Sequence, residues 1–333
     1  MAILKAYAAW HKDAAVLGNC ASGGVASALA EATIKTNGIV VGAAYDEELR
    51  VKHIVVERPE ELPRIRGVKY VHSIIDKSIY EQIVAALRAN RRVFFFGLPC
   101  QCAAVRKYVN CHYQPSTPTS NLLIADLICF GAPPQSLWMK YVAWLQAKRG
   151  KRLININPRD KKYAHDRVTY YCYDWEDGKV ERKLSLYDPY AQAFYRAIAF
   201  RRCCYNCQFR GENRAADLTL SDFHGAAKVG ISRERIAKGV SAILCHAEKG
   251  LHALEALNLN LFEVKPSDIS DNNFPYANSA ALPSLWNAFA ADIKTMDFAG
   301  LVKKYGLQIT KMKRGVDKWK CAVVCLLRKM GVR

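Results

Sequence analysis

Two stretches of this 333-residue chain share one plan: an apolar segment, then a cysteine, then a helix-forming segment. Residues 92–97 predict a buried strand that leads to Cys100, and residues 122–128 predict another that leads to Cys129. Strands that alternate with helices in this way form parallel sheets. Because ligands of open α/β sheets gather at the carboxyl ends of the strands, both cysteines are expected where a ligand binds.

The apolar pattern predicts further strands and helices around these two units. Strands are predicted at residues 38–45, 51–57, 168–175, 180–186, 216–223, 239–246 and 261–264. Helices are predicted at residues 25–35, 76–90, 103–108, 136–147, 189–200 and 251–257, after an extended lead-in at 12–17. We therefore expect an α/β fold with a mixed, largely parallel central sheet and flanking helices.

Composition divides the chain into two parts. Residues 1–265 hold the alternating apolar segments, and we expect one α/β domain with an N-terminal part at 1–90 and a C-terminal part at 91–265. Residues 266–333 are expected to form a polar linker and a basic helical tail. From residue 301 onward ten lysines and arginines face one acidic residue, so much of the net charge of +19 lies in this tail.

The basic tail leaves two interpretations open. Residues 318–329 have an apolar centre with basic residues on both sides, which suits an anionic membrane surface. The same segment can instead pack on the body of the protein with its lysines in water. Because the charge excess of the body is milder, the composition does not favour a nucleic-acid-binding protein.

The chain is expected to be cytosolic. No apolar run reaches the roughly 18–20 residues that span a bilayer, and the N-terminus lacks the pattern of a signal peptide. In a reducing compartment, twelve cysteines favour metal or redox use over a disulfide framework. Four of them are instead expected to be small buried apolar residues: Cys172, Cys245, Cys321 and Cys325.

The strongest metal-site signal is the Cys-x-x-Cys pair of Cys204 and Cys207. Such a pair supplies two soft ligands from one turn, and Cys100 and Cys129 are candidates to complete a set of four. A thioredoxin-like dithiol follows an early strand and opens a helix, whereas this pair follows a predicted helix. Spacing alone leaves an iron–sulfur cluster and a zinc ion as alternatives.

A glycine-rich turn at residues 18–24 precedes the helix predicted at 25–35. The first N–H groups of a helix and its dipole favour a phosphate, although this turn matches neither the dinucleotide fingerprint nor the P-loop. An ordinary tight turn is the alternative. Residues 66–73 are basic and aromatic between core elements, so they are expected either to line a ligand site or to form a solvated loop.

Several short motifs occur in a specific order along the chain. They are Ala21-Ser22-Gly23-Gly24-Val25, the segment 66–73, Gly97-Leu98-Pro99-Cys100-Gln101, the segment 126–133, Cys204-Tyr205-Asn206-Cys207 with 211–214, the segment 217–223, and Gly239-Val240-Ser241. On these motifs the chain resembles the coenzyme F420 hydrogenase/dehydrogenase β-subunit family of iron–sulfur flavoproteins. The resemblance covers residues 20–250, about two thirds of the chain.

The resemblance implies a FAD-binding α/β domain that carries a [4Fe–4S] cluster. By motif, the cluster ligands are expected to be Cys100, Cys129, Cys204 and Cys207. The flavin site is expected to include Ser22, Gly23, Gly24, Val25, Lys69, Tyr70 and Ser73. Arg66 and Arg214 are expected to bind the flavin phosphates or an anionic substrate.

The chain also departs from the family pattern. Many relatives carry an N-terminal ferredoxin-like module, so this chain resembles a stand-alone form. Cys102 and Cys203 lie beside expected ligands, and either is a candidate to replace one of them. Phe130 stands where His is common and His224 where Trp is common, which leaves the substrate open.

The pair of cofactors implies a redox function. A cluster carries one electron and a flavin two, so the expected activity joins a one-electron donor such as ferredoxin to a two-electron small-molecule substrate. Coenzyme F420 and the sugars of polysaccharide biosynthesis are candidate substrates of such relatives. The candidate proton donors are His72, Asp126, Glu212 and Asp222, each with a structural role as its alternative.

Two other functions remain open from the sequence. One is a non-catalytic electron-transfer subunit of a larger redox complex. The other is a zinc-stabilised module that binds polyanions. The expected location is the cytoplasm, with a peripheral position at the inner face of the membrane if the tail binds lipid.

Overall fold

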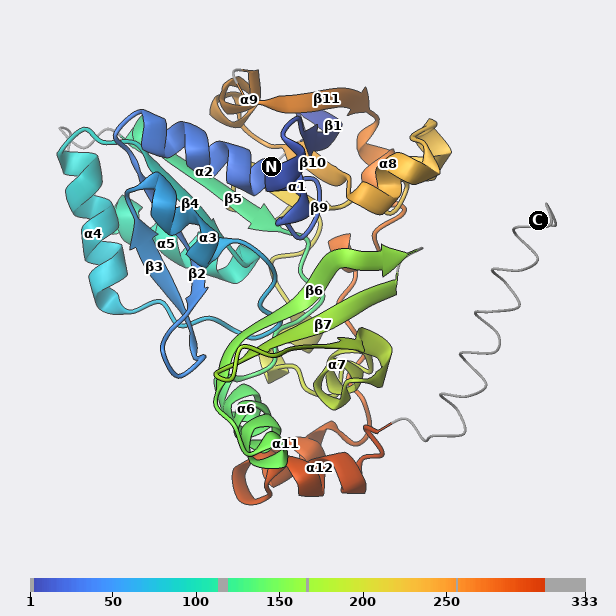
Figure 1. Cartoon of the computed structure of the whole chain (residues 1–333). Helices are drawn as coiled ribbons and strands as arrows, with labels where there is room; N and C mark the ends of the chain where they lie inside the picture. Colours follow the sequence, from blue (N-terminus) through green and yellow to red (C-terminus); the bar gives the residue numbers. More distant parts are fainter. Residues whose placement is uncertain (1–2, 113–118, 166–167, 256, 309–333) are drawn as a thin grey trace.

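The computed structural model describes residues 3–112, 119–165, 168–255 and 257–308. These residues fold around an eight-stranded sheet with the order β11-β1-β10-β9-β5-β4-β2-β3 (Figure 1). Its strands are β1 (Lys5–His11), β2 (Ile39–Tyr45), β3 (Val51–Val56), β4 (Val93–Gly97), β5 (Leu122–Leu127), β9 (Leu218–Asp222), β10 (Ser241–Cys245) and β11 (Leu259–Val264).

Parallel and antiparallel pairing occupy different parts of this sheet. The pairs β2–β4, β4–β5 and β5–β9 are parallel, and the pairs toward both edges are antiparallel. The predicted α/β fold with a mixed central sheet and flanking helices is thus confirmed, but the sheet is not largely parallel as expected, because four of its seven strand pairs among the described residues are antiparallel. Because β4 and β5 are parallel neighbours, the two segments that carry Cys100 and Cys129 leave the sheet at the same edge.

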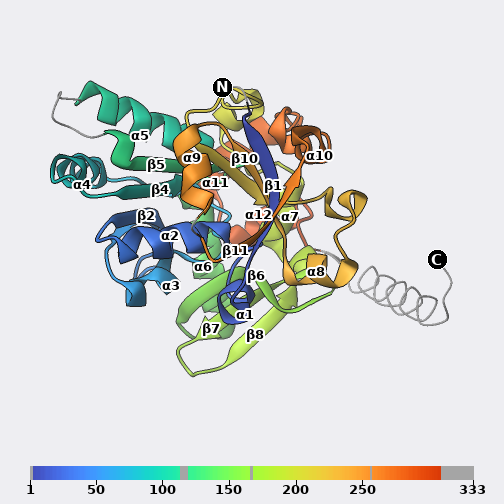
Figure 2. The ribbon, with the colours of Figure 1, turned by 90° about the horizontal axis from the view of Figure 1, so that it is seen from above.

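The described residues contain twelve α-helices, some of which cover the two faces of the large sheet. They are α1 (Ala14–Gly18), α2 (Val25–Lys35), α3 (Leu62–Ile65), α4 (Lys77–Arg88), α5 (Pro99–Cys111), α6 (Gln135–Arg149), α7 (Pro189–Tyr195), α8 (Arg233–Lys238), α9 (Glu248–Glu255), α10 (Pro266–Ser270), α11 (Trp286–Thr295) and α12 (Phe298–Lys304). Figure 2 shows α2 and α5 on opposite sides of β4. None of the helices among the described residues is both long and apolar enough to cross a bilayer.

The alternation of side chains along the strands explains these two layers. Phe94 of β4 is buried beneath α2, whereas its neighbour Phe95 is buried beneath α4 and α5. Successive strand residues point to opposite faces, so a strand with apolar residues at every position is covered on both sides. The continuous apolar run at 92–97 therefore predicts this arrangement correctly.

A second, three-stranded antiparallel sheet has the order β6-β7-β8, formed by β6 (Leu153–His165), β7 (Val168–Trp175) and β8 (Val180–Leu184). Figure 1 shows β6 and β7 between the large sheet and the helices α6 and α7. The β7–β8 hairpin is predicted by its turn residues. The sequence did not predict β6, because this segment contains Pro158 and a run of charged residues, and its pairing with β7 shifts register.

The N-terminal segment differs from its prediction. Residues 5–11 form the strand β1, and the segment at 12–17 contains α1 instead of an extended lead-in. The Asp13 side chain accepts hydrogen bonds from the N–H groups of Ala15 (2.7 Å) and Val16 (3.4 Å). Such a cap satisfies free N–H groups and starts a helix, which explains the difference.

The region after residue 265 also contains regular structure. The helix α10 lies within the predicted linker, and α11 and α12 bury Phe289 and Phe298 in a core cluster that includes Tyr141 of α6. The predicted division into a domain at 1–265 and a linker with tail at 266–333 remains a prediction. The basic segment from residue 309 onward lies outside the described residues.

Candidate functional site

A small cavity collects cysteines from three distant segments of the chain. Its volume is about 110 Å³, and the cysteines that line it are Cys100, Cys129, Cys203, Cys204 and Cys207. A water molecule takes about 30 Å³ of liquid volume, so this cavity has room for a group of several atoms. Among the described residues, no three His, Cys, Asp or Glu side chains are arranged to hold a single metal ion.

Each cysteine segment reaches the cavity by a short path. The strand β4 ends at Gly97, and Cys100 lies in the first turn of α5. The strand β5 ends at Leu127, two residues before Cys129. The Cys-x-x-Cys pair lies in a 3₁₀ turn at Arg202–Asn206 and just after it. The four cysteines expected as cluster ligands are therefore brought together by the fold.

Hydrogen bonds of two arginines, one through its side chain and one through its backbone, connect the 3₁₀ turn to the segment after β5. The Arg210 guanidinium donates hydrogen bonds to the carbonyl groups of Cys129, Phe130 (3.3 Å) and Pro275 (2.5 Å). The backbone N–H of Arg201 donates to the carbonyl of Ala132 at 3.2 Å. These contacts join residues 201–210 to the segment that follows β5, and they fix the spacing of the thiols.

The other two candidate cysteines occupy different environments. Cys102 is fully buried in the core between α5 and the sheet, with its sulfur 3.6 Å from the carbonyl oxygen of Ala125. It lines neither cavity described here. Cys203 does line the cysteine cavity and is exposed to solvent. The geometry thus leaves Cys203 as a fifth thiol beside the expected set.

Burial favours the protonated form of two of these thiols, Cys129 and Cys204. Burial raises the pKa of Cys129 to about 12, with a further contribution from the negative charge of a neighbouring Cys204 thiolate. Burial likewise raises the pKa of Cys204 to about 11. A metal centre supplies the positive charge that stabilises such thiolates, so this set of donors suits a soft metal group.

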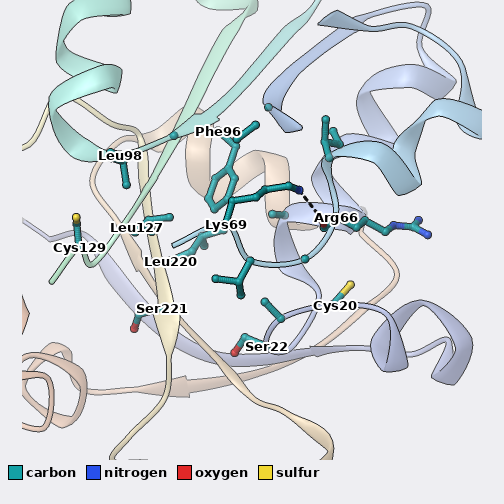
Figure 3. A pocket seen from close by; sticks show the side chains of 18 of the residues that line it. Cys20, Ser22, Arg66, Lys69, Phe96, Leu98, Leu127, Cys129, Leu220 and Ser221 are labelled. Atoms are coloured by element: carbon teal, nitrogen blue, oxygen red, sulfur yellow. Dashed lines mark hydrogen bonds between the residues drawn. The ribbon is translucent and has the colours of Figure 1, made fainter. Parts of the chain in front are cut away.

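A larger cavity of about 430 Å³ lies beside the cysteine cavity. Its volume is in the range of sites that hold small molecules or cofactors. Cys129 lies at one end of it, and Cys20 and Ser22 lie at the other (Figure 3). The two cavities share a wall, made of Leu98, Cys129, Gly131 and Ala132.

The glycine turn forms the far end of this larger cavity. Gly24 has a φ of +85° and precedes α2, whose first residues line the cavity. Gly23 packs so tightly that a Cβ atom would lie 2.2 Å from the carbonyl oxygen of Ala9, and its N–H donates to Ser241 Oγ at 2.8 Å. The free N–H groups in the first turn of α2 can therefore hold an anionic group.

Basic and polar residues of the segment 66–73 line the same cavity. The Arg66 Nη2 atom donates to Glu31 at 2.8 Å, while its Nε atom is buried without a partner among the described residues. Tyr70 packs on Phe194, and the Ser73 hydroxyl accepts a hydrogen bond from Gln101 Nε2 at 3.0 Å. The predicted residues Ser22, Gly24, Val25, Arg66, Lys69, Tyr70 and Ser73 all line the cavity.

Lys69 has carbonyl groups and no carboxylate as hydrogen-bond partners among the described residues. Its Nζ atom donates to the carbonyl oxygen of Arg66 at 2.7 Å (Figure 3). It also lies 3.4 Å from the carbonyl oxygen of Arg64. Burial lowers the pKa of Lys69 to about 7, because a charged ammonium is poorly solvated there. The cavity therefore contains a lysine that titrates near neutral pH.

Sequence reasoning missed two basic residues of β6. Arg159 lines the larger cavity and forms an ion pair with Asp222. Lys161 donates to the carbonyl oxygens of Leu17 (3.3 Å) and Ser22, so it ties the second sheet to the glycine turn. No signal in the sequence indicated these roles, because the contacts depend on how the second sheet packs against the large one.

The histidine His53 was also missed. It is buried in β3, lines the larger cavity and stacks on Phe95 with ring centroids 5.2 Å apart. Its Nε2 atom lies 3.3 Å from the carbonyl oxygen of Phe96, and its Nδ1 atom has no partner among the described residues. Burial lowers the pKa of His53 to about 4, so this imidazole is neutral at pH 7.

The four candidate proton donors lie in four different places. Asp222 lines the larger cavity, and His72 lines the cysteine cavity. Burial and then the charge of Arg201 lower the pKa of His72 to about 4, so its imidazole is neutral at pH 7. Glu212 is exposed and lines neither cavity.

Asp126 and Arg214 form a buried ion pair with each other. The Arg214 Nη1 atom lies 3.0 Å from Asp126 Oδ2, and Thr219 donates to Asp126 Oδ1 at 2.6 Å. Neither member of the pair lines either of the two cavities. The pair joins β5 to the segment that follows the Cys-x-x-Cys turn, so its position is structural.

Comparison with known protein families gives two matches along the chain. Residues 6–79 match the family model for the N-terminal part of the coenzyme F420 hydrogenase/dehydrogenase beta subunit. Residues 90–270, more than half of the chain, match the family model for the C-terminal part of the same beta subunit. A search of curated proteins finds no match.

A solved structure shares the fold. It is a chain of the F420-reducing [NiFe] hydrogenase complex from Methanosarcina barkeri, studied by xenon derivatization. The similarity has a TM-score of 0.51 with 19% sequence identity, and it covers 81% of this chain and 90% of that chain. At this level of identity the similarity concerns the fold.

We expect Lys69→Met to stabilise the ligand-free protein in a pH-dependent way. The ordinary lysine pKa is 10.5 and the pKa in the folded protein is about 7, so the unfolded chain binds more protons between these values. The variant should be more stable by up to about 5 kcal/mol at pH 6, because it removes a buried ammonium group and each unit between the two pKa values corresponds to about 1.4 kcal/mol. This advantage should shrink as the pH rises above 7.

Urea unfolding at a series of pH values measures the effect. Lys35→Met is the matched control, because Lys35 is exposed at the end of α2. The control should change the free energy of unfolding equally at all these pH values. If the free energies of unfolding of Lys69→Met and the wild type differ by the same amount from pH 6 to pH 9.5, the folded protein does not lower the pKa of Lys69.

Proposed function

Because this chain belongs to the coenzyme F420 hydrogenase/dehydrogenase β-subunit family, a family of oxidoreductase subunits, we propose that it is an iron–sulfur flavoprotein. Its function would be to pass electrons between a one-electron carrier and a two-electron substrate, with a [4Fe–4S] cluster and FAD as resident cofactors. The wall shared by the two cavities is the observation that carries this proposal. It supports two redox groups held side by side.

The residues of the smaller cavity fit a cluster. Cys100, Cys129, Cys204 and Cys207 would be the ligands, since each lines the cavity. Four thiolates from scattered segments are a common ligand set for such clusters, and the volume of about 110 Å³ exceeds what one ion needs. When bound, the cluster supplies one-electron transfer.

The residues of the larger cavity fit a flavin. The glycine turn and Arg66 would hold the phosphates at one end, where helix N–H groups and a guanidinium lie. The end near Cys129 would hold the ring system, which must lie close to the cluster for electron exchange. When bound, the flavin supplies two-electron chemistry toward the substrate.

The proposed electron donor is ferredoxin or a similar carrier. Cys203 is exposed and lines the cysteine cavity, so the cavity approaches the surface there. Arg201 lines the cavity as well and adds positive charge. A basic surface near a cluster favours an acidic carrier through electrostatic attraction.

The proposed substrate is a small molecule that enters the larger cavity. Among the four candidate proton donors, Asp222 lines this cavity. Burial opposes ionisation of its carboxyl group, but the ion pair with Arg159 lowers its pKa, so we propose that Asp222 accepts a proton in the reaction. Coenzyme F420 and a sugar of polysaccharide biosynthesis are the candidate substrates. Turnover of either by the anaerobically purified chain with an artificial donor would support an enzyme, whereas none would indicate a non-catalytic electron-transfer subunit.

Replacement of a ligand cysteine should remove the cluster. We expect Cys129→Ser and Cys207→Ser proteins, purified anaerobically, to lose most of the iron and the broad brown absorbance of the original protein, because a serine oxygen is a poor ligand for this centre. Iron analysis and visible absorption spectra give the measurement. The wild-type protein should contain about four iron atoms per chain.

Two further variants serve as controls for the ligand set. Cys102→Ala changes a buried thiol outside both cavities, so the iron content should stay unchanged. Cys203→Ser should also keep its iron, because Cys204 is expected to be the ligand. An iron-free wild-type protein that binds one zinc ion would instead support the zinc-stabilised alternative.

Arg66→Met should weaken FAD binding by a factor of at least about ten. A hydrogen bond between a guanidinium and a phosphate contributes about 1.5–3 kcal/mol, and 1.4 kcal/mol corresponds to a factor of ten. Titration of the flavin-free protein with FAD gives the dissociation constant. Arg64→Met is the control, because Arg64 is exposed and lines neither cavity. If Arg66→Met and Arg64→Met bind FAD with equal affinity, Arg66 does not contribute to FAD binding.

The location proposed for the protein is the cytoplasm, with a peripheral position at the membrane. The support is the basic, apolar-centred segment at 318–329, which lies outside the described residues. Full-length protein should sediment with vesicles that contain anionic lipid, and a chain that ends at residue 308 should not. Equal sedimentation of both chains would rule out membrane binding by the tail.

A further inference from the structure

Arg210 has more hydrogen-bonding capacity than its protein contacts use. Its Nη1 and Nη2 atoms donate to the carbonyl oxygens of Cys129, Phe130 and Pro275. Its Nε atom is buried and has no acceptor among the described residues. A buried donor without an acceptor costs about 1–3 kcal/mol, so such a group indicates a missing partner.

The position of Arg210 points to what that partner is. Arg210 lines the cysteine cavity together with Cys100, Cys129 and Cys207. Its guanidinium is in direct contact with the segment of Cys129, because the Nη1 atom donates to the carbonyl oxygen of this residue. An acceptor inside this cavity would be surrounded by sulfur and would carry negative charge.

We propose that Arg210 donates its Nε hydrogen bond to a sulfur of the cluster and thereby sets the reduction potential of the cluster. This inference rests on the proposed function, since it requires a cluster in the cysteine cavity. Reduction adds one electron to a group that is already negative. A neighbouring positive charge and a hydrogen bond to sulfur both stabilise the reduced state more than the oxidised one.

The same guanidinium has a second role as a positioning group. Through the carbonyl oxygens of Cys129 and Phe130 it holds the segment after β5 against the 3₁₀ turn. One side chain thus fixes the spacing of the ligands and also tunes the potential. These two roles are separable by experiment, because a change in spacing alters cluster content and a change in charge alters the potential.

The experiment is a redox titration of the intact, anaerobically purified protein with dithionite as reductant. Arg210→Gln removes the charge and the Nε donor. We expect the reduction potential of its cluster to be about 59 mV lower than that of the wild type. For one electron this difference corresponds to a tenfold change in the equilibrium constant. Arg210→Lys keeps the charge and removes the Nε donor, so its potential should fall between the other two.

Arg202→Gln is the matched control for a change of charge near the cysteines. Arg202 is exposed, stacks over Trp286 and does not line the cavity. Solvent screens its charge, so the potential should stay close to that of the wild type. If the reduction potentials of both Arg210 variants equal that of Arg202→Gln, the inference is wrong. The presence of the cluster would still be established in that case.

A measurement on the wild type covers the case in which Arg210→Gln does not assemble a cluster. Protein that contains arginine labelled with ¹⁵N at Nε should show a weak magnetic coupling between this nucleus and the reduced cluster in pulsed electron paramagnetic resonance. The coupling should be absent from Arg210→Lys. No coupling in the wild type would overturn the inference, and wild-type protein without iron would overturn the proposed function as well.

Discussion

The parallel pairing of β4 with β5 is the constraint on which the rest of the site depends. In this pair Gly97 lies opposite Asp126, so both strands end at the same level of the sheet. Cys100 and Cys129 follow these ends directly and line one cavity at that edge. An antiparallel arrangement would have placed the two cysteines at opposite ends of the strands, about the length of a strand apart.

Contacts of three arginine residues also hold the segments that carry the cysteines together. The guanidinium of Arg210 and the backbone N–H of Arg201 connect the Cys-x-x-Cys turn to the end of β5, and the buried pair of Arg214 with Asp126 adds a third link. A buried ion pair is costly to form and costly to break, so it favours one arrangement of the segments it joins. The basic surroundings also suit a negatively charged group of thiolates and sulfides.

The second sheet completes the larger cavity from the other side. Asp188 anchors it, because its carboxylate accepts hydrogen bonds from Tyr141 (2.6 Å) and Tyr173 (2.8 Å) in the core. The adjacent Tyr190 donates to the carbonyl oxygen of Tyr70 at 2.8 Å, which links this core to the wall of the cavity. Arg159 and Lys161 then reach the cavity and the glycine turn from β6. The residues that line the larger cavity therefore come from both sheets.

The sequence by itself determined the local parts of this protein. Apolar periodicity predicted the strands around Cys100 and Cys129, and the glycine turn predicted the start of α2, because these signals depend on neighbouring residues. Ordered motifs identified the family. Only the tertiary structure decided that Cys203 lines the cysteine cavity while Cys102 does not, that Arg214 pairs with Asp126 outside both cavities, and that β6 supplies Arg159. These outcomes depend on contacts between segments far apart in the chain, and no local pattern of side chains encodes such contacts.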